Sequence, residues 1–167
     1  MRIDETLAVS RSFAGGSINV RNANTTAANG AGIWAGGIVG RKISGQLNRT
    51  AHVGRNLTGG QVNISAQGGI ARNVGRIFGV SEGTVPANNY ASNAIFVGEH
   101  ADYWVFSIPL AIVPGTPTAA SQHGANATNA QFSSSAFWTT APMSFGSVWR
   151  FNGVSQGWPS LANVGGQ

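Results

Sequence analysis

The segment AGGIVGRKISGQ at residues 35–46 is partly repeated as VGRIFGVSEGTVP at residues 74–86. Ile38-Val39-Gly40 aligns with Ile77-Phe78-Gly79, so the two copies lie 39 residues apart. Repeats on the scale of about 20 to 50 residues are typical of stacked architectures, in which each unit buries its apolar face against the next. Such arrays usually serve as scaffolds and binding surfaces. The repeat therefore predicts a stacked array and a non-enzymatic role.

Glycine and small polar residues dominate the chain. There are 24 glycines among 167 residues, and charged residues make up only 9%. Between the glycines stand short alternating fragments such as Val62-Asn63-Ile64-Ser65, whose apolar side chains would face one side of a strand. Glycine supplies the positive φ that tight corners need. We therefore expect an all-β fold, a short β-solenoid (β-helix-like) with about 20 residues per turn.

The composition changes after residue 95. Eleven of the fifteen aromatic residues lie between Phe96 and the C-terminus. An open solenoid end exposes unpaired strand edges, so an aromatic-rich C-terminal capping unit is expected there. We predict one continuous domain. Its residues 1–95 would comprise a lead-in at 1–14 followed by Gly-rich solenoid turns, and residues 96–167 would form an apolar arm and the aromatic cap.

Basic residues are concentrated in the first half of the chain. The net charge is +5, and the stretch from Thr6 to Ser81 holds eight Lys or Arg residues but no Asp or Glu. A basic face of this kind can bind anionic glycans or other polyanions. The alternative is an ordinary soluble surface whose few charges are arginine. The candidates for polyanion binding are Arg41, Lys42, Arg49, Arg55, Arg72 and Arg76.

The longest apolar run, Tyr103–Pro114, is too short for a membrane helix, which needs about 20 residues. It is either part of the core or an exposed arm that would serve as a self-association site. No membrane span is expected. The candidate self-association residues are Tyr103, Trp104, Val105, Phe106, Ile108, Leu110 and Ile112.

Candidate catalytic groups are few. The sequence has no cysteine, which excludes disulfides and thiolate metal sites. Phosphate-loop and dinucleotide-binding fingerprints are also missing. Glu99, His100 and Asp102 lie close together and could act in acid–base chemistry or bind a metal, but a polar turn between two strands is the simpler interpretation. We expect no catalytic residues, cofactor, metal or nucleic-acid partner.

Several segments resemble the GLUG-motif repeat proteins, which are bacterial surface and secreted proteins. The matching text is GGIVGRKISGQLNRTAHVG, NVGRIFGVSEGTVPANNYASN and an ending with Phe137-Trp138, Val148-Trp149 and Pro159. The resemblance implies a β-solenoid and an extracellular or cell-surface setting, and brings no catalytic residues. The chain differs from the family in two respects. It has room for only a few repeats, and the apolar run at 103–114 stands where family members often have polar residues.

These observations favour a non-enzymatic extracellular structural protein, a solenoid subunit of a cell-surface or secreted assembly or fibre. The alternative is an adhesin module that binds anionic glycans or host surface molecules through its basic face. A carbohydrate-active enzyme that uses Glu99 and Asp102 is a distant third.

Overall fold

A computed structural model of the chain describes residues 2–3, 8–22, 32–43, 46–53, 60–66, 72–83, 86–100, 111–112, 116–147, 149–151 and 159–161. Strands predominate in this part of the chain, as predicted, and the sheets are small and mainly parallel. The strands are β1 (Arg2–Ile3), β2 (Ala8–Ala14), β3 (Ile18–Asn22), β4 (Ile33–Gly36), β5 (Val39–Lys42), β6 (Gln46–His52), β7 (Gly60–Ala66), β8 (Arg72–Gly75), β9 (Phe78–Ser81), β10 (Tyr90–Ser92), β11 (Ile95–His100), β12 (Ala111–Ile112), β13 (Ala125–Ala127), β14 (Trp149–Arg150) and β15 (Ser160–Leu161). The helices are α1 (Asn129–Phe132) and α2 (Ser135–Thr139).

Parallel pairing relates successive sets of strands, which we call layers. The first layer is β1, β2 and β3, the second is β4 to β7, and the third is β8 to β11. In three sheets a second-layer strand lies between a first-layer and a third-layer strand, giving the orders β1-β5-β9, β2-β6-β10 and β3-β7-β11. A fourth sheet joins β4 to β8. Within residues 1–14, where a lead-in was expected, β2 pairs in parallel with β6.

The register of these sheets reproduces the spacing of the sequence repeat. Val39 lies opposite Phe78, 39 residues later, and the spacing ranges from 35 residues between β7 and β11 to 44 between β3 and β7. The expected spacing of about 20 residues is therefore wrong. The reason is that the second layer consists of four strands, β4 to β7, and the chain runs through all four before it reaches β8, the in-register partner of β4.

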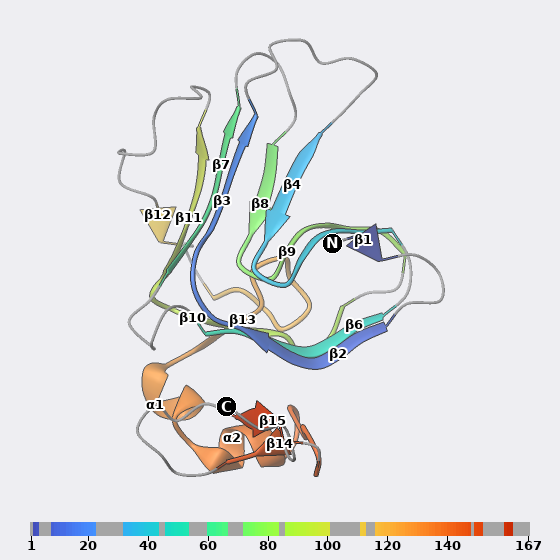
Figure 1. The fold of residues 1–167 in the computed structure, drawn as a ribbon, viewed down its shortest axis with the longest axis vertical. Helices are drawn as coiled ribbons and strands as arrows, with labels where there is room; N and C mark the ends of the chain where they lie inside the picture. Colours follow the sequence, from blue (N-terminus) through green and yellow to red (C-terminus); the bar gives the residue numbers. More distant parts are fainter. Residues whose placement is uncertain are drawn as a thin grey trace.

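The apolar core lies between these sheets. Figure 1 shows β3, β7 and β11 along one side, β4 and β8 opposite them, and β2, β6, β10 and β13 along the bottom. Val39, Leu47, Val62, Ile77 and Ile95 are each at most 1% exposed and belong to one cluster. Four of them come from different strands and Ile77 from the bend between β8 and β9, so they join the sheets of the second and third layers into one packed unit.

A glycine pair makes the bend between β4 and β5. Gly37 N donates to Arg76 O over 3.1 Å, and Ile38 N donates to Ile77 O over 3.0 Å, so the bends of the second and third layers are hydrogen-bonded. A Cβ at Gly36 would collide with the backbone of Phe78. Glycine is therefore required here by the close approach of two backbones.

The aromatic C-terminal segment packs on the face of the sheet β13-β10-β6-β2. Trp138 is fully buried, and its Nε1 donates to Phe132 O over 2.7 Å. Its ring lies 5.8 Å from that of Phe13 on β2, whereas the rings of Phe137 and Tyr90 on β10 are 5.3 Å apart. In Figure 1, α1, α2, β14 and β15 lie below this sheet. The aromatic cluster thus crosses strands from every layer, whereas a cap on the end of the array was expected.

Candidate functional site

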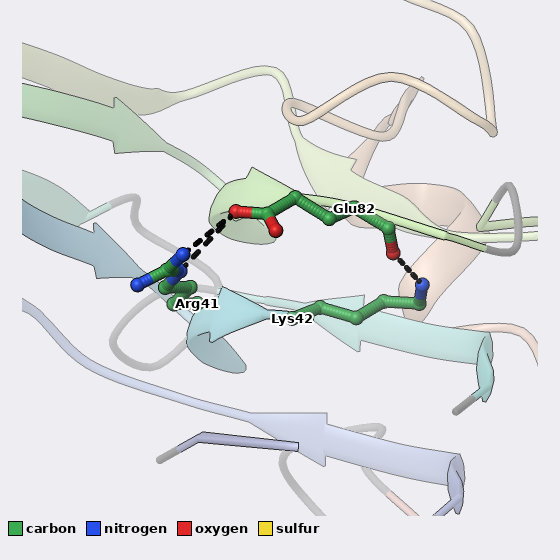
Figure 2. A network of polar contacts seen from close by, with 3 residues as sticks. All are labelled: Arg41, Lys42 and Glu82. Carbon is green, nitrogen blue, oxygen red and sulfur yellow. Dashed lines mark hydrogen bonds and ion pairs between the residues drawn. The ribbon is translucent and has the colours of Figure 1, made fainter. Parts of the chain in front are cut away.

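Arg41, a candidate for polyanion binding, already has partners. Its Nη2 lies 2.9 Å from Glu82 Oε1, as Figure 2 shows. Its guanidinium is also 4.8 Å from the centre of the Trp34 ring. The Arg41 and Glu82 side chains are 35% and 48% exposed, so this ion pair contributes little to stability. It does neutralise Arg41 locally, which weakens the prediction that Arg41 attracts an anion.

Lys42, the next residue on β5, is fully buried. Its Nζ donates to the backbone oxygen of Glu82 over 2.7 Å, as Figure 2 shows. Burial lowers the pKa of Lys42, because desolvation disfavours the charged form. The prediction that Lys42 lies on a binding surface is wrong. The lysine instead ties β5 to the end of β9.

Arg76 is also buried, with 1% of its surface exposed. It donates to Ser92 O over 2.9 Å and to Asn126 Oδ1 over 2.7 Å, and its remaining acceptors are the backbone oxygens of His123 and Gly124. Burial lowers its pKa to about 10, so Arg76 keeps its charge at neutral pH. A surface role for Arg76 is therefore wrong. The side chain joins the third layer to β13 through oxygen acceptors.

His52 continues this buried polar line towards the first layer. Its Nδ1 lies 2.9 Å from Arg76 O and its Nε2 lies 2.9 Å from Gly16 O. A neutral imidazole has one N–H, so it can donate to only one of these two oxygens. Burial, with a smaller effect from the charge of Arg76, lowers the pKa of His52. Sequence analysis did not identify this role, because no other histidine and no acidic residue lies near His52 in the sequence.

The other basic candidates differ in what the structure says of them. Arg49 on β6 is half-buried, and its Nε is buried without a hydrogen-bond partner. The backbone of Arg72 begins β8. The Arg72 side chain and the whole of Arg55 lie outside the described residues. Of the six candidates, Arg49 is thus the one whose described side chain is neither fully buried nor already paired.

Arg49 belongs to a column of residues with positive φ. The values are +48° at Arg11, +54° at Arg49 and +55° at Asn88. The register places Arg11 beside Arg49, because the flanking pairs are Ser10 with Asn48 and Ser12 with Thr50. An isolated bridge between Asn48 and Ala87 places Asn88 next in line. Sequence analysis missed Arg11, since nothing in the residue type signals a left-handed bend.

The predicted self-association segment lies largely outside the described residues. This applies to Tyr103, Trp104, Val105, Phe106, Ile108 and Leu110. The backbone of Ile112 is described, and β12 pairs antiparallel with β11, with Ile112 opposite Phe96. Phe96 is 39% exposed.

The two ends of the layered array differ. β1, β2 and β3 are the outermost strands of their sheets, so each has an edge to which no described strand is paired. At the other end, β12 covers β11 and β13 covers β10. Gln122 O accepts hydrogen bonds from Ile77 N and Phe78 N at the third-layer bend. β8 and β9 remain outermost in their sheets. The first layer is therefore the more open end.

The acidic residues considered as a catalytic or metal site lie largely outside the described residues. Glu99 and His100 end β11, and their side chains, like all of Asp102, lie outside the described part. Within that part, no group of three or more His, Cys, Asp or Glu residues could hold a metal ion. None of the helices found there is long and apolar enough to cross a membrane.

Comparison with known proteins gives no relative: no family model, curated protein or solved structure matches the chain.

Proposed function

We propose that the chain is a non-enzymatic structural protein, a β-solenoid whose layers are successive turns and whose first layer associates with another copy. The parallel register at spacings of 35 to 44 residues supports the solenoid. The resemblance to GLUG-motif repeats supports a place at a bacterial cell surface or outside the cell.

The observation that carries the proposed association is the open edge of β2 and β3. These strands have seven and five residues. An edge strand of this length can add a strand from another chain, which supplies backbone hydrogen bonds. Few charges would have to be desolvated, because charged residues form only 9% of the chain.

The difference between the two ends limits how such an assembly grows. A head-to-tail fibre needs an open edge at both ends, whereas β13 covers β10 and β12 covers β11. Two copies joined through their first layers form a closed, two-fold symmetric pair. Growth into a fibre requires a second surface, for which the apolar segment 103–112 is the candidate.

Cysteine crosslinking tests this proposal directly, because the native chain has no cysteine. Ser10→Cys places a thiol on the exposed edge strand β2, and Ser133→Cys places one on the exposed end of α1 as the matched control. We expect a dimer by light scattering and a disulfide-linked dimer with Ser10→Cys but not with Ser133→Cys. A monomer at millimolar concentration would reject self-association. Fibres in negative stain would keep self-association and reject the closed pair.

The structure gives less support to an adhesin with a broad basic face. Lys42 and Arg76 are buried, and Arg41 is paired with Glu82. Three of the six candidate cations thereby have partners within the protein, and this is why we favour assembly.

A further inference from the structure

We propose that Arg11 and Arg49 together form a binding site for a tetrahedral oxyanion, that is, a sulfate or phosphate group. The proposal does not depend on self-association. It is based on the shared backbone conformation of the two residues, their register, and the unsatisfied Nε of Arg49.

The backbone places the two side chains next to each other. Arg11 and Arg49 occupy the same register position in β2 and β6, between the pairs Ser10–Asn48 and Ser12–Thr50. Their φ angles, +48° and +54°, differ by a few degrees, so the chain bends alike in both layers. Neighbouring strands lie about 4.8 Å apart, and equal bends in register direct equivalent side chains the same way. Two guanidinium groups therefore leave the same side of the sheet from adjacent strands.

The charges of the two arginines are uncompensated among the described residues. Glu82, the acidic residue whose side chain is described, pairs with Arg41. Like charges opposite each other on adjacent strands repel. The third residue of the column, Asn88, is neutral and donates from Nδ2 to Asn48 Oδ1. An anion between Arg11 and Arg49 would remove the repulsion.

The buried Nε of Arg49 identifies what the site lacks. A buried donor without an acceptor costs free energy, and such groups in native proteins are rare. A guanidinium presents Nε and one Nη as a fork that matches two oxygens of an oxyanion. A tetrahedral anion has further oxygens available for the second guanidinium. Arg11 is exposed and Arg49 is half-buried, so a ligand can approach the pair from solvent, and a shift of the Arg49 side chain would bring its buried Nε to the ligand.

Both the free ion and an ester group on a polymer share this chemistry. Titrations should therefore use sodium sulfate, sodium phosphate and heparin, each at constant ionic strength. Arg11→Gln and Arg49→Gln remove one positive charge each. Arg150→Gln removes the same charge from an exposed residue on β14 and serves as the control. Arg49→Lys keeps the charge but lacks the guanidinium fork. Far-ultraviolet circular dichroism checks that each variant folds.

We expect Arg11→Gln, Arg49→Gln and Arg49→Lys to weaken binding of the free ions at least about tenfold, because each loses charge-assisted hydrogen bonds. Arg150→Gln should stay within about twofold of the parent chain, since Arg150 is not part of the proposed site and an exposed charge outside it is screened by salt. A heparin affinity that exceeds the sulfate affinity and falls in the same variants would identify a polymer as the source of the group. Equal losses in all four variants, or no binding of any probe, would overturn the proposal.

Discussion

Asn89 offers a sharp test of how the layers are joined. This residue is fully buried, and its Oδ1 accepts from Thr50 Oγ1 over 2.8 Å and from Thr50 N over 3.3 Å. Its Nδ2 donates to Leu47 O over 3.4 Å and to Ala119 O over 3.3 Å. One side chain thus connects the second layer, the third layer and the segment that covers the third layer. Removing it affects all three.

We expect Asn89→Ala to lower the free energy of unfolding by about 2–4 kcal/mol, from one strong hydrogen bond, three long ones and the buried groups left without partners. Thr50→Val removes only the 2.8 Å bond and should cost about 1 kcal/mol. Denaturant titration followed by circular dichroism measures both. A loss below about 0.5 kcal/mol in Asn89→Ala, the range typical of surface substitutions, would refute the buried network.

Asn89→Asp distinguishes this network from simple packing, because the two side chains have nearly the same shape. At neutral pH the substitution places a carboxylate beside the oxygens of Leu47 and Ala119, so it should destabilise more than Asn89→Ala. Burial would raise the pKa of the new carboxyl group above its unfolded value of about 4. The folded state then binds the proton more tightly, so the excess cost should shrink as the pH falls towards 4. A pH-independent difference from Asn89→Ala would contradict the assigned contacts.

Three further predictions concern other buried groups. Burial lowers the pKa of both His52 and His123 in the folded protein, so below about pH 6.5 the unfolded chain binds more protons than the folded one. The free energy of unfolding should therefore fall by up to about 1.4 kcal/mol per pH unit for each histidine. Denaturant titrations at pH 7.5 and 5.5 measure this fall, and equal stability at both pH values would contradict it. Trp138→Ala should lower the free energy of unfolding by about 3–5 kcal/mol. Trp138→Phe should lower it less, because phenylalanine loses the Nε1 hydrogen bond but keeps a buried ring. Equal losses in denaturant titrations would argue against the packing described. Gly37→Ala should destabilise by about 1–3 kcal/mol, because its Cβ would overlap the His52 ring and Arg76 O; an unchanged melting temperature would show that the bend is looser.

The sequence predicted the strand-rich class, and the register follows its 39-residue repeat, not the expected turn of about 20 residues. The echo between Ile38 and Ile77 reappears as a hydrogen bond between their backbones and as the pairing of Val39 with Phe78. Glycine and aliphatic residues carry this signal, because a bend in close contact with its neighbour tolerates few alternatives. The number of strands per layer was not predictable, since β4 to β7 are short and the segments between them have no common sequence pattern.

The sites were harder to predict, because burial depends on where each bend directs a side chain. Lys42 and Arg76 look like surface cations in the sequence. Lys42 lies at the end of β5 and Arg76 at the bend between β8 and β9, yet both side chains are buried. Their acceptors are mostly backbone oxygens, which leave no mark in the residue types. Arg11 and Arg49 were not linked, because the positive φ that relates them appears in non-glycine residues.

The layered fold requires that β2 and β6 lie side by side in the stated register. In the cysteine-free chain, the double variant Ser10→Cys/Asn48→Cys joins directly opposite residues, whereas Ser10→Cys/Gln46→Cys is displaced by two positions. Paired strands place opposite Cα atoms about 4.8 Å apart, within the reach of a disulfide, and the displaced pair exceeds about 7 Å. Mass spectrometry of the monomer after mild oxidation should find the intramolecular disulfide in the first variant alone. Its formation in the second variant and not in the first would contradict the layered register.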